Sequence, residues 1–138
     1  MNQSILNAGI QLTGRVLMSA IFILAGINKI SGYAGTQGYM ESMGVPGALL
    51  PLVILLEVGG GLAILSGWQS RIAAFLLAGF CVVSAVIFHA NFADQMQSIL
   101  FMKNLAMAGG LMLLVAGETH MFSIDARKKA SLRGNTHE

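Results

Sequence analysis

The residue with the clearest chemical potential is Glu57, in the middle of the apolar stretch LPLVILLEVGGGLAIL. In a helix that crosses a bilayer, this position is about ten residues from either end, or on the order of 15 Å deep at about 1.5 Å per residue. A lone carboxylate at that depth is unfavourable, so it must be protonated, paired with a cation or in contact with a wet cavity. The sequence leaves two roles open for Glu57: a structural pair that fixes helix order, and a proton-handling site.

Two cations are candidate partners for this carboxylate, Lys103 and Arg15. Lys103 lies about six residues inside a later apolar stretch, roughly 9 Å deep by the same rise per residue, and Asn104 beside it can add a hydrogen bond. Arg15 approaches from the other face of the membrane, close enough for its side chain to extend into water. We therefore expect Lys103 to pair with Glu57 in preference to Arg15.

Further polar side chains are expected at a depth similar to that of Lys103. His89 lies near the end of the third apolar stretch and Lys29 near the end of the first. A histidine close to a carboxylate and a cation can relay a proton near neutral pH. Alone, each of these residues is explained by solvation at the membrane surface, but together they predict a polar pocket. The candidate residues are Glu57 and His89 for catalysis, and Lys29, Lys103, Asn104 and Arg15 for ligand binding.

The metal-binding residue types do not form a recognisable site. The histidines are His89, His120 and His137, and the first is expected at the opposite face of the membrane from the other two, so they cannot hold one haem. No pair of Cys, His or carboxylate residues has ligand spacing within a helix. The single cysteine, Cys81, excludes a disulfide or dithiol centre within the chain. We expect no metal and no covalent cofactor.

The elements that position these residues must be membrane helices. The chain has 138 residues, of which 55% are hydrophobic and only 10% charged, and its mean hydropathy is +0.72. A soluble domain averages roughly 25% charged residues, so these few charges could not cover a water-soluble globule. Backbone groups in lipid must bond internally, which favours helices, and the alternating pattern of a membrane barrel is absent. The lipid bilayer is thus the first expected partner.

Four apolar segments approach the roughly 20 residues that cross a bilayer. They lie at about 12–30, 48–67, 72–92 and 98–117. This predicts an all-α integral membrane protein, a four-transmembrane-helix bundle in residues 1–126, followed by a basic tail at 127–138. A short helix on the membrane surface is expected to begin near Thr36. Gly59, Gly60 and Gly61 are expected to allow close packing between helices.

The distribution of cations predicts the orientation of the bundle. Six cations lie on the side that carries both termini, namely Arg15, Arg71, Arg127, Lys128, Lys129 and Arg133. Only Lys29 and Lys103 lie on the other side. The positive-inside rule therefore favours cytoplasmic termini. Position beside the membrane also explains the basic tail better than nucleic-acid binding does.

These residues occur in a combination that resembles the DoxX family of small membrane proteins, over about residues 12–127. The resemblance is carried by Arg15 at the start of the first span and by Gly26-Ile27-Asn28-Lys29 at its end. It continues through Glu57 with Gly61, Gly67 with Arg71, His89, and the pair Lys103-Asn104. Each feature is weak alone, and the set is specific.

The resemblance implies a multi-pass protein of the bacterial inner membrane. Members of the family are often described as oxidoreductases. Related proteins form part of a thiosulfate:quinone oxidoreductase, and others are linked to oxidative stress or to detoxification of quinones and aromatic electrophiles. The resemblance thus implies a quinone-linked redox role with a partner subunit. This chain carries no flavin, haem, iron–sulfur or dithiol motif, so electrons would require a diffusible quinone or a cofactor on another chain.

Three functions remain open from the sequence. The leading one is a quinone-linked oxidoreductase component or quinone-binding membrane subunit. In it Lys103, Asn104 or His89 donates hydrogen bonds to the quinone carbonyls, and Glu57 handles a proton. The second is a non-enzymatic membrane scaffold or assembly subunit for a partner protein, with Glu57 and Lys103 as a structural pair. The third, a small-molecule permease, would require a homo-oligomer, because four short helices leave little room for an alternating pathway.

Overall fold

The computed structural model describes residues 2–117 and 121–136, and within those ranges the chain is helical and has no strands. Four segments are long and apolar enough to cross a membrane: α1 (Gln3–Ser31), the run Gly47–Ser66, α5 (Ser70–Phe88) and α6 (Gln95–Ala116). Two further helices lie outside these spans, α2 (Tyr33–Ser42) and α7 (Ile124–Gly134). The predicted all-α, four-span architecture is confirmed.

The second span is built from several helical types in succession. It consists of a 3-10 turn η1 (Gly47–Leu49), α3 (Leu50–Ile54), a π-helical turn η2 (Leu55–Gly59) and α4 (Gly60–Ser66). Pro51 lies in the first turn of α3, where its missing N–H breaks no helical hydrogen bond. The span ends where Gly67 takes φ +71°, a left-handed conformation that glycine adopts without strain.

The ends of the other spans are set by capping residues and differ from the sequence prediction. α1 begins at Gln3, nine residues before the expected start, because the Asn2 side chain accepts a hydrogen bond from the Ser4 N–H at 3.1 Å. α5 ends at Phe88, earlier than the expected 92. α6 begins at Gln95 rather than near 98, because the Asp94 side chain accepts from the Met96 N–H at 2.9 Å.

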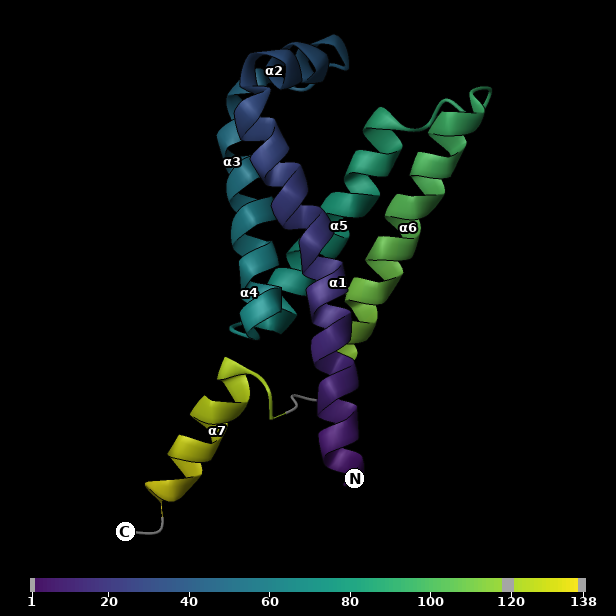
Figure 1. Cartoon of the computed structure of the whole chain (residues 1–138). Helices are drawn as coiled ribbons and strands as arrows, with labels where there is room; N and C mark the ends of the chain where they lie inside the picture. The colour runs from purple at the N-terminus through teal and green to yellow at the C-terminus, as the bar shows by residue number, and fades with distance from the viewer. Residues whose placement is uncertain (1, 118–120, 137–138) are drawn as a thin grey trace.

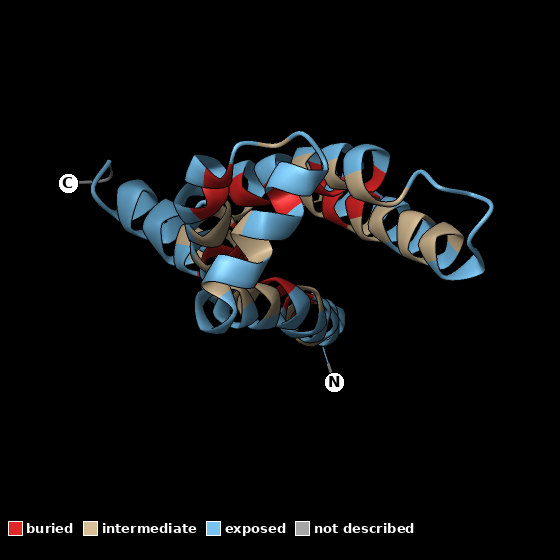
Figure 2. Cartoon of the chain, turned by 90° about the horizontal axis from the view of Figure 1, so that it is seen from above, coloured by how far each residue is buried: buried red, intermediate tan, exposed pale blue. Residues whose placement is uncertain are grey.

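The spans form two arms that meet at one end (Figure 1). One arm contains α1 with the composite span η1–α4, and the other contains α5 paired along its length with α6. The arms join where α4 packs on α5, and α6 touches α1 very little. Buried residues are concentrated along the inward sides of the helices, and the outward faces are exposed (Figure 2). In a membrane protein, those outward faces are the surfaces that lipid covers.

The end of the molecule away from the chain termini is crossed by α2, the surface helix expected near Thr36, which begins at Tyr33. The ring of Tyr39 on α2 stacks on that of Phe88 at the end of α5, with centroids 5.5 Å apart. This aromatic contact joins the two arms at their separated ends.

Candidate functional site

The buried carboxylate Glu57 pairs with Lys29. Glu57 is only 1% exposed. The Lys29 Nζ lies 2.9 Å from Oε1 and donates a hydrogen bond to Oε2 at 3.2 Å. The expected pairing with Lys103 or Arg15 is therefore wrong. The residue that the sequence had assigned only to the surrounding pocket is the partner.

Close approach of the backbones explains this pairing. A Cβ on Gly26 would overlap Val58 Cγ2 and lie 3.4 Å from Glu57 Cβ. Because residues three apart share a face of a helix, Lys29 stands on the same face of α1 as Gly26. The absent side chain at Gly26 thus lets η2 come near enough for the carboxylate to reach the ammonium.

Two of the three consecutive glycines confirm the packing role expected for them. A Cβ on Gly61 would lie 2.7 Å from Ile23 Cγ1 on α1, and a Cβ on Gly60 would lie 2.9 Å from Leu77 Cδ1 on α5. Gly59 meets nothing closer than 4.0 Å. The segment that follows Glu57 is therefore wedged between α1 and α5, which fixes the carboxylate in position.

Glu57 lies in the middle of the π-helical turn η2, a feature that the sequence analysis missed. A π turn holds one residue more than the α-helix around it and is found often at functional sites. The run of glycines beside it was the available signal, since glycine weakens an α-helix by roughly 1 kcal/mol relative to alanine.

The pair retains unused hydrogen-bonding capacity. Glu57 Oε1 is buried and accepts no hydrogen bond from the part of the chain that the structure describes, although the ammonium lies beside it. Lys29 has three N–H donors, and its side chain remains 29% exposed. The lysine side of the pair can therefore donate to a small molecule, while the carboxylate is covered by the protein.

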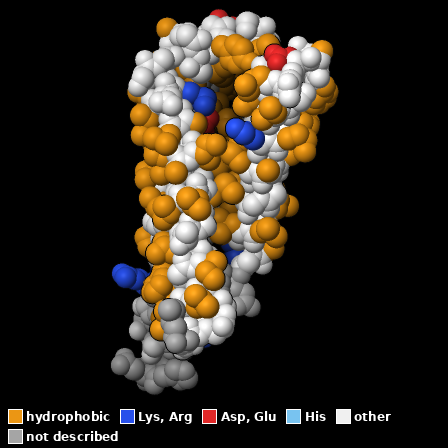
Figure 3. Space-filling model, turned by 45° about the vertical axis from the view of Figure 1, so that its right-hand side comes forward, with side chains coloured by type: hydrophobic (Ala, Val, Ile, Leu, Met, Phe, Trp, Pro, Cys, Tyr) orange, Lys and Arg blue, Asp and Glu red, His pale blue; other side chains and the backbone are white. Residues whose placement is uncertain are grey.

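Lys103 faces a groove rather than the pair. α6 meets α1 near the convergent ends of the arms, where a Cβ on Gly110 would lie 2.6 Å from Met18 Cε. Lys103 is seven residues earlier and so stands on the same face of α6, two turns farther out. It lines a groove of about 510 Å³ with Gln95, Ser98, Ile99, Met102 and Ala106. Figure 3 shows this end of the molecule hollowed, with basic side chains at the rim and an acidic group within.

Asn104 and His89 are engaged elsewhere. Asn104 Nδ2 donates to the Leu100 carbonyl of its own helix at 3.0 Å. His89 caps α5, and its Nδ1 lies 2.8 Å from Gln97 Oε1 in the first turn of α6. The His89–Gln97 contact joins α5 to α6, whereas Asn104 bonds within α6, and the contacts of Glu57 include neither residue. Gln97 was not among the predicted residues.

Arg15 lies at the opposite end of the bundle from the pair. It precedes Lys29 by 14 residues on α1, which is about 21 Å along the helix at 1.5 Å per residue. It is 2% exposed, and its Nη2 donates to the Phe122 carbonyl. A Cβ on Gly67 would overlap Arg15, so glycine is required there for space as well as for its positive φ. Arg15 anchors the segment after α6 and does not join the pocket.

Within residues 2–117 and 121–136, no three His, Cys, Asp or Glu side chains cluster as a metal site. His120 and His137 lie outside the described residues. The arrangement that remains is a buried ion pair whose partly exposed lysine has N–H donors to spare, near the hollow between the arms.

Comparison with known proteins gives a consistent picture. The chain matches the DoxX family over residues 10–90. It is 56% identical over 114 residues to "Inner membrane protein YqjF" of Escherichia coli (strain K12), across 83% of this chain and 88% of that protein. It is 32% identical over 123 residues to "Inner membrane protein YphA" of the same strain, across 84% and 88%.

A more distant similarity links the chain to a protein of Bacillus subtilis (strain 168). That protein is named "Putative oxidoreductase CatD", and the two are 30% identical over 73 residues, or 53% of this chain and 54% of that protein. No solved structure matches the chain significantly.

Proposed function

From the premise that the chain belongs to the DoxX family and is a multi-pass inner-membrane protein, we propose that it is the quinone-binding component of a membrane oxidoreductase. The observation that carries the proposal is the buried Lys29–Glu57 pair, near the hollow at the separated ends of the arms. The similarity to a relative whose name describes an oxidoreductase supports the same class of function.

The pair has the donor and acceptor that a quinone headgroup requires. A quinone has two carbonyl oxygens, and its reduction adds two electrons and two protons to give hydroxyls. Lys29 donates a hydrogen bond to one oxygen from an N–H that Glu57 leaves free. Glu57 supplies one proton, takes up another from water through the partly exposed side of Lys29, and then supplies the second. In this proposal the electrons come from a reduced redox protein that binds the chain as a partner.

The hollow between the separated ends of the arms supports access from the lipid. α6 makes little contact with α1, so this hollow opens sideways between the two helices. Lys103 lines a groove formed by α6 residues alone, and its ammonium is a second donor for a molecule that enters beside α6. A molecule dissolved in the membrane could therefore reach the pair without crossing water.

The test is the quinone content of the purified protein. The chain is isolated in mild detergent, extracted with organic solvent, and its quinone is quantified per chain by mass spectrometry. We expect near-stoichiometric quinone in the wild type and at least about a tenfold loss in Glu57→Gln, the change expected when a charged partner is removed from a buried site. Glu41→Gln, at an exposed acid of α2, is the matched control and should keep its quinone. Background amounts in all three proteins would refute the proposal.

A scaffold is the alternative function, and the same ion pair favours it. The pair links α1 to η2, so a purely structural role would leave the surface to bind a partner protein. In that case the exchanged variant Lys29→Glu/Glu57→Lys should restore partner binding, which each single change would weaken. Proton transfer to a quinone would not survive this exchange.

A further inference from the structure

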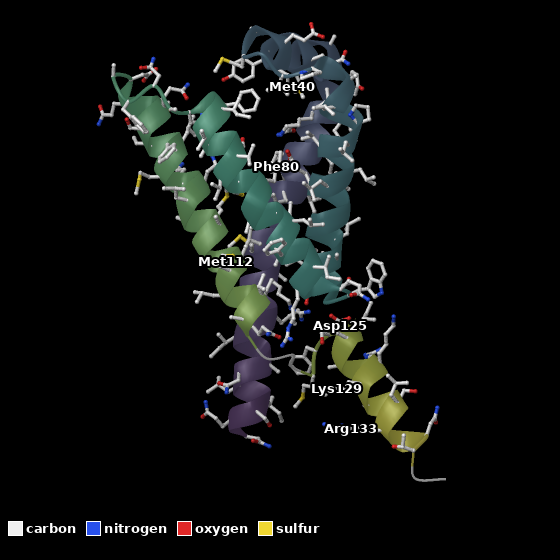
Figure 4. The ribbon with its side chains drawn as sticks, turned by 180° about the vertical axis from the view of Figure 1, so that it is seen from behind. Met40, Phe80, Met112, Asp125, Lys129 and Arg133 are labelled. Carbon is white, nitrogen blue, oxygen red and sulfur yellow. The ribbon has the colours of Figure 1, made fainter. Side chains whose placement is uncertain are left out.

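The first turn of α7 is fixed to the end of the bundle where both chain termini lie. The Asp125 carboxylate accepts hydrogen bonds from the Gln69 N–H at 3.0 Å and the Ser70 N–H at 3.4 Å, at the start of α5. Its own N–H donates to the Gly67 carbonyl at 3.1 Å. Figure 4 shows Asp125 beside the α4–α5 turn, with Lys129 and Arg133 farther along α7. Because this turn joins two membrane spans, α7 begins at the membrane surface.

The rest of α7 carries concentrated positive charge. Arg127, Lys128, Lys129 and Arg133 are all exposed, and no ion pair between them and an acid is recorded in the described part of the chain. The only acid in the helix is Asp125, whose carboxylate faces the backbone of α5. The charge that the helix exposes is therefore positive.

An apolar groove lies next to this basic helix. Phe122, two residues before α7, lines it together with Ile5, Leu6, Ile10 and other residues of the first turns of α1, and its volume is about 660 Å³. The chain has no charged residue before Arg15. A charged helix thus adjoins an apolar groove at the end of the bundle where α7 is attached.

We infer that α7 and the start of α1 form a binding surface for anionic phospholipids, with the headgroup phosphates against α7 and an acyl chain in the apolar groove. Lys and Arg side chains are attracted to an anionic surface, and the effect requires proximity within about a Debye length. The contact of Asp125 with α5 satisfies that requirement, because it holds the start of α7 at the membrane surface. Lipid is favoured over an acidic protein segment because the cations flank an acyl-sized apolar groove.

The single tryptophan, Trp68, is a built-in reporter of this surface. It is half exposed and adjoins Gln69, to which Asp125 binds. The full-length chain is reconstituted into vesicles in which either the anionic phosphatidylglycerol or the neutral phosphatidylcholine carries brominated acyl chains, which quench tryptophan. The lipid composition is the same in both leaflets, so the orientation of the protein does not affect the result.

We expect brominated phosphatidylglycerol to bind near Trp68 at least about twofold more strongly than phosphatidylcholine, with the preference lost at high salt. The variant R127Q/K128Q/K129Q/R133Q should lose the preference, since glutamine keeps helix propensity but not charge. The matched variant R127K/K128R/K129R/R133K should retain it. Equal quenching by both lipids in the wild type would overturn the proposal and favour an acidic protein partner. A preference that persists at high salt would also overturn it, because salt screens the attraction between charges. Quinone content does not enter this readout, so the two proposals fail independently.

Discussion

At Lys29 and Glu57, a carboxylate that is 1% exposed is balanced by an ammonium that still reaches solvent or ligand. Removing the cation leaves a buried charge without a partner. We expect Lys29→Met to destabilise the protein, but by less than the roughly 3–5 kcal/mol of a fully buried pair, because Lys29 is itself partly exposed. The measurement is the temperature at which half of the detergent-solubilised protein leaves the monodisperse peak in size-exclusion chromatography.

The double variant Lys29→Met/Glu57→Gln is the control for this prediction. Glutamine has nearly the shape of glutamate without its charge, so the double variant should be more stable than Lys29→Met alone. Equal losses in both proteins would show that the pairing of charge contributes nothing, and that only the packing of the lysine stem matters.

Gly26 provides a second prediction at a single residue. A methyl group there overlaps Val58, whereas a methyl group on Gly14 meets nothing within 4 Å. We expect Gly26→Ala to destabilise the protein by about 1–3 kcal/mol, as overpacking does. Gly14→Ala should be neutral or stabilising by up to about 1 kcal/mol, because alanine favours a helix. Thermal melting of the two variants side by side measures the contrast, and similar behaviour would contradict the close approach of α1 and η2.

The sequence identifies Glu57 because an acid in an apolar helix is conspicuous, but its partner could not be predicted in the same way. The number of residues from the helix end gives only the depth of a side chain in the membrane, and by depth alone Lys103 is the better partner for Glu57. The actual choice depends on the face of the helix and on the distance between backbones. Both are set by Gly26, whose contact with Val58 appears only after the helices are packed.

Among the elements, η2 has the most direct bearing on the site. A π turn contains one more residue than the α-helix that would replace it, so deletion of one residue should leave the flanking segments α3 and α4 in register. We expect deletion of Gly59, which packs against nothing close, to give a folded protein that has lost the Glu57–Lys29 pairing. Deletion of Leu62 in α4 should prevent folding, because it rotates the part of the helix before residue 62 relative to the part after it, by about 100° at 3.6 residues per turn. Yield and monodispersity in detergent distinguish these outcomes.

The spans themselves were predictable from hydropathy, and their ends were not. The length of an apolar stretch predicts each membrane-spanning helix, because lipid requires a continuous hydrogen-bonded helix. The ends depend on individual side chains, such as Asn2, which extends α1, and Asp94, which begins α6 earlier. The π turn was not predicted because a run of glycines indicates a weak point in a helix without specifying which helical type forms there.

At the scale of the whole molecule, the arms meet at one end, and at the other the aromatic contact of Tyr39 with Phe88 bridges them. The four-helix bundle predicted from the sequence suggests a closed core. Apolar helices in lipid, however, gain little free energy from burying apolar surface against one another, so close packing depends on small residues. Those residues lie between α1, α4 and α5. α6 has little such contact with α1, and this leaves between the arms the hollow that the proposed quinone would enter.

The orientation of the molecule provides the last prediction. The structure places α7, Arg15 and Arg71 at the end that holds both termini, and Lys29 at the other. This distribution of cations favours cytoplasmic termini. A green fluorescent protein fused after residue 138 should therefore fluoresce, because it folds in the cytoplasm, and a fused alkaline phosphatase should be inactive. Neutralising the four cations of α7 leaves two cations at each end and so removes the bias, and both reporters should then give intermediate signals. If phosphatase is active on the unaltered chain, the orientation is reversed, and the Lys29–Glu57 pair lies in the half of the membrane that faces the cytoplasm.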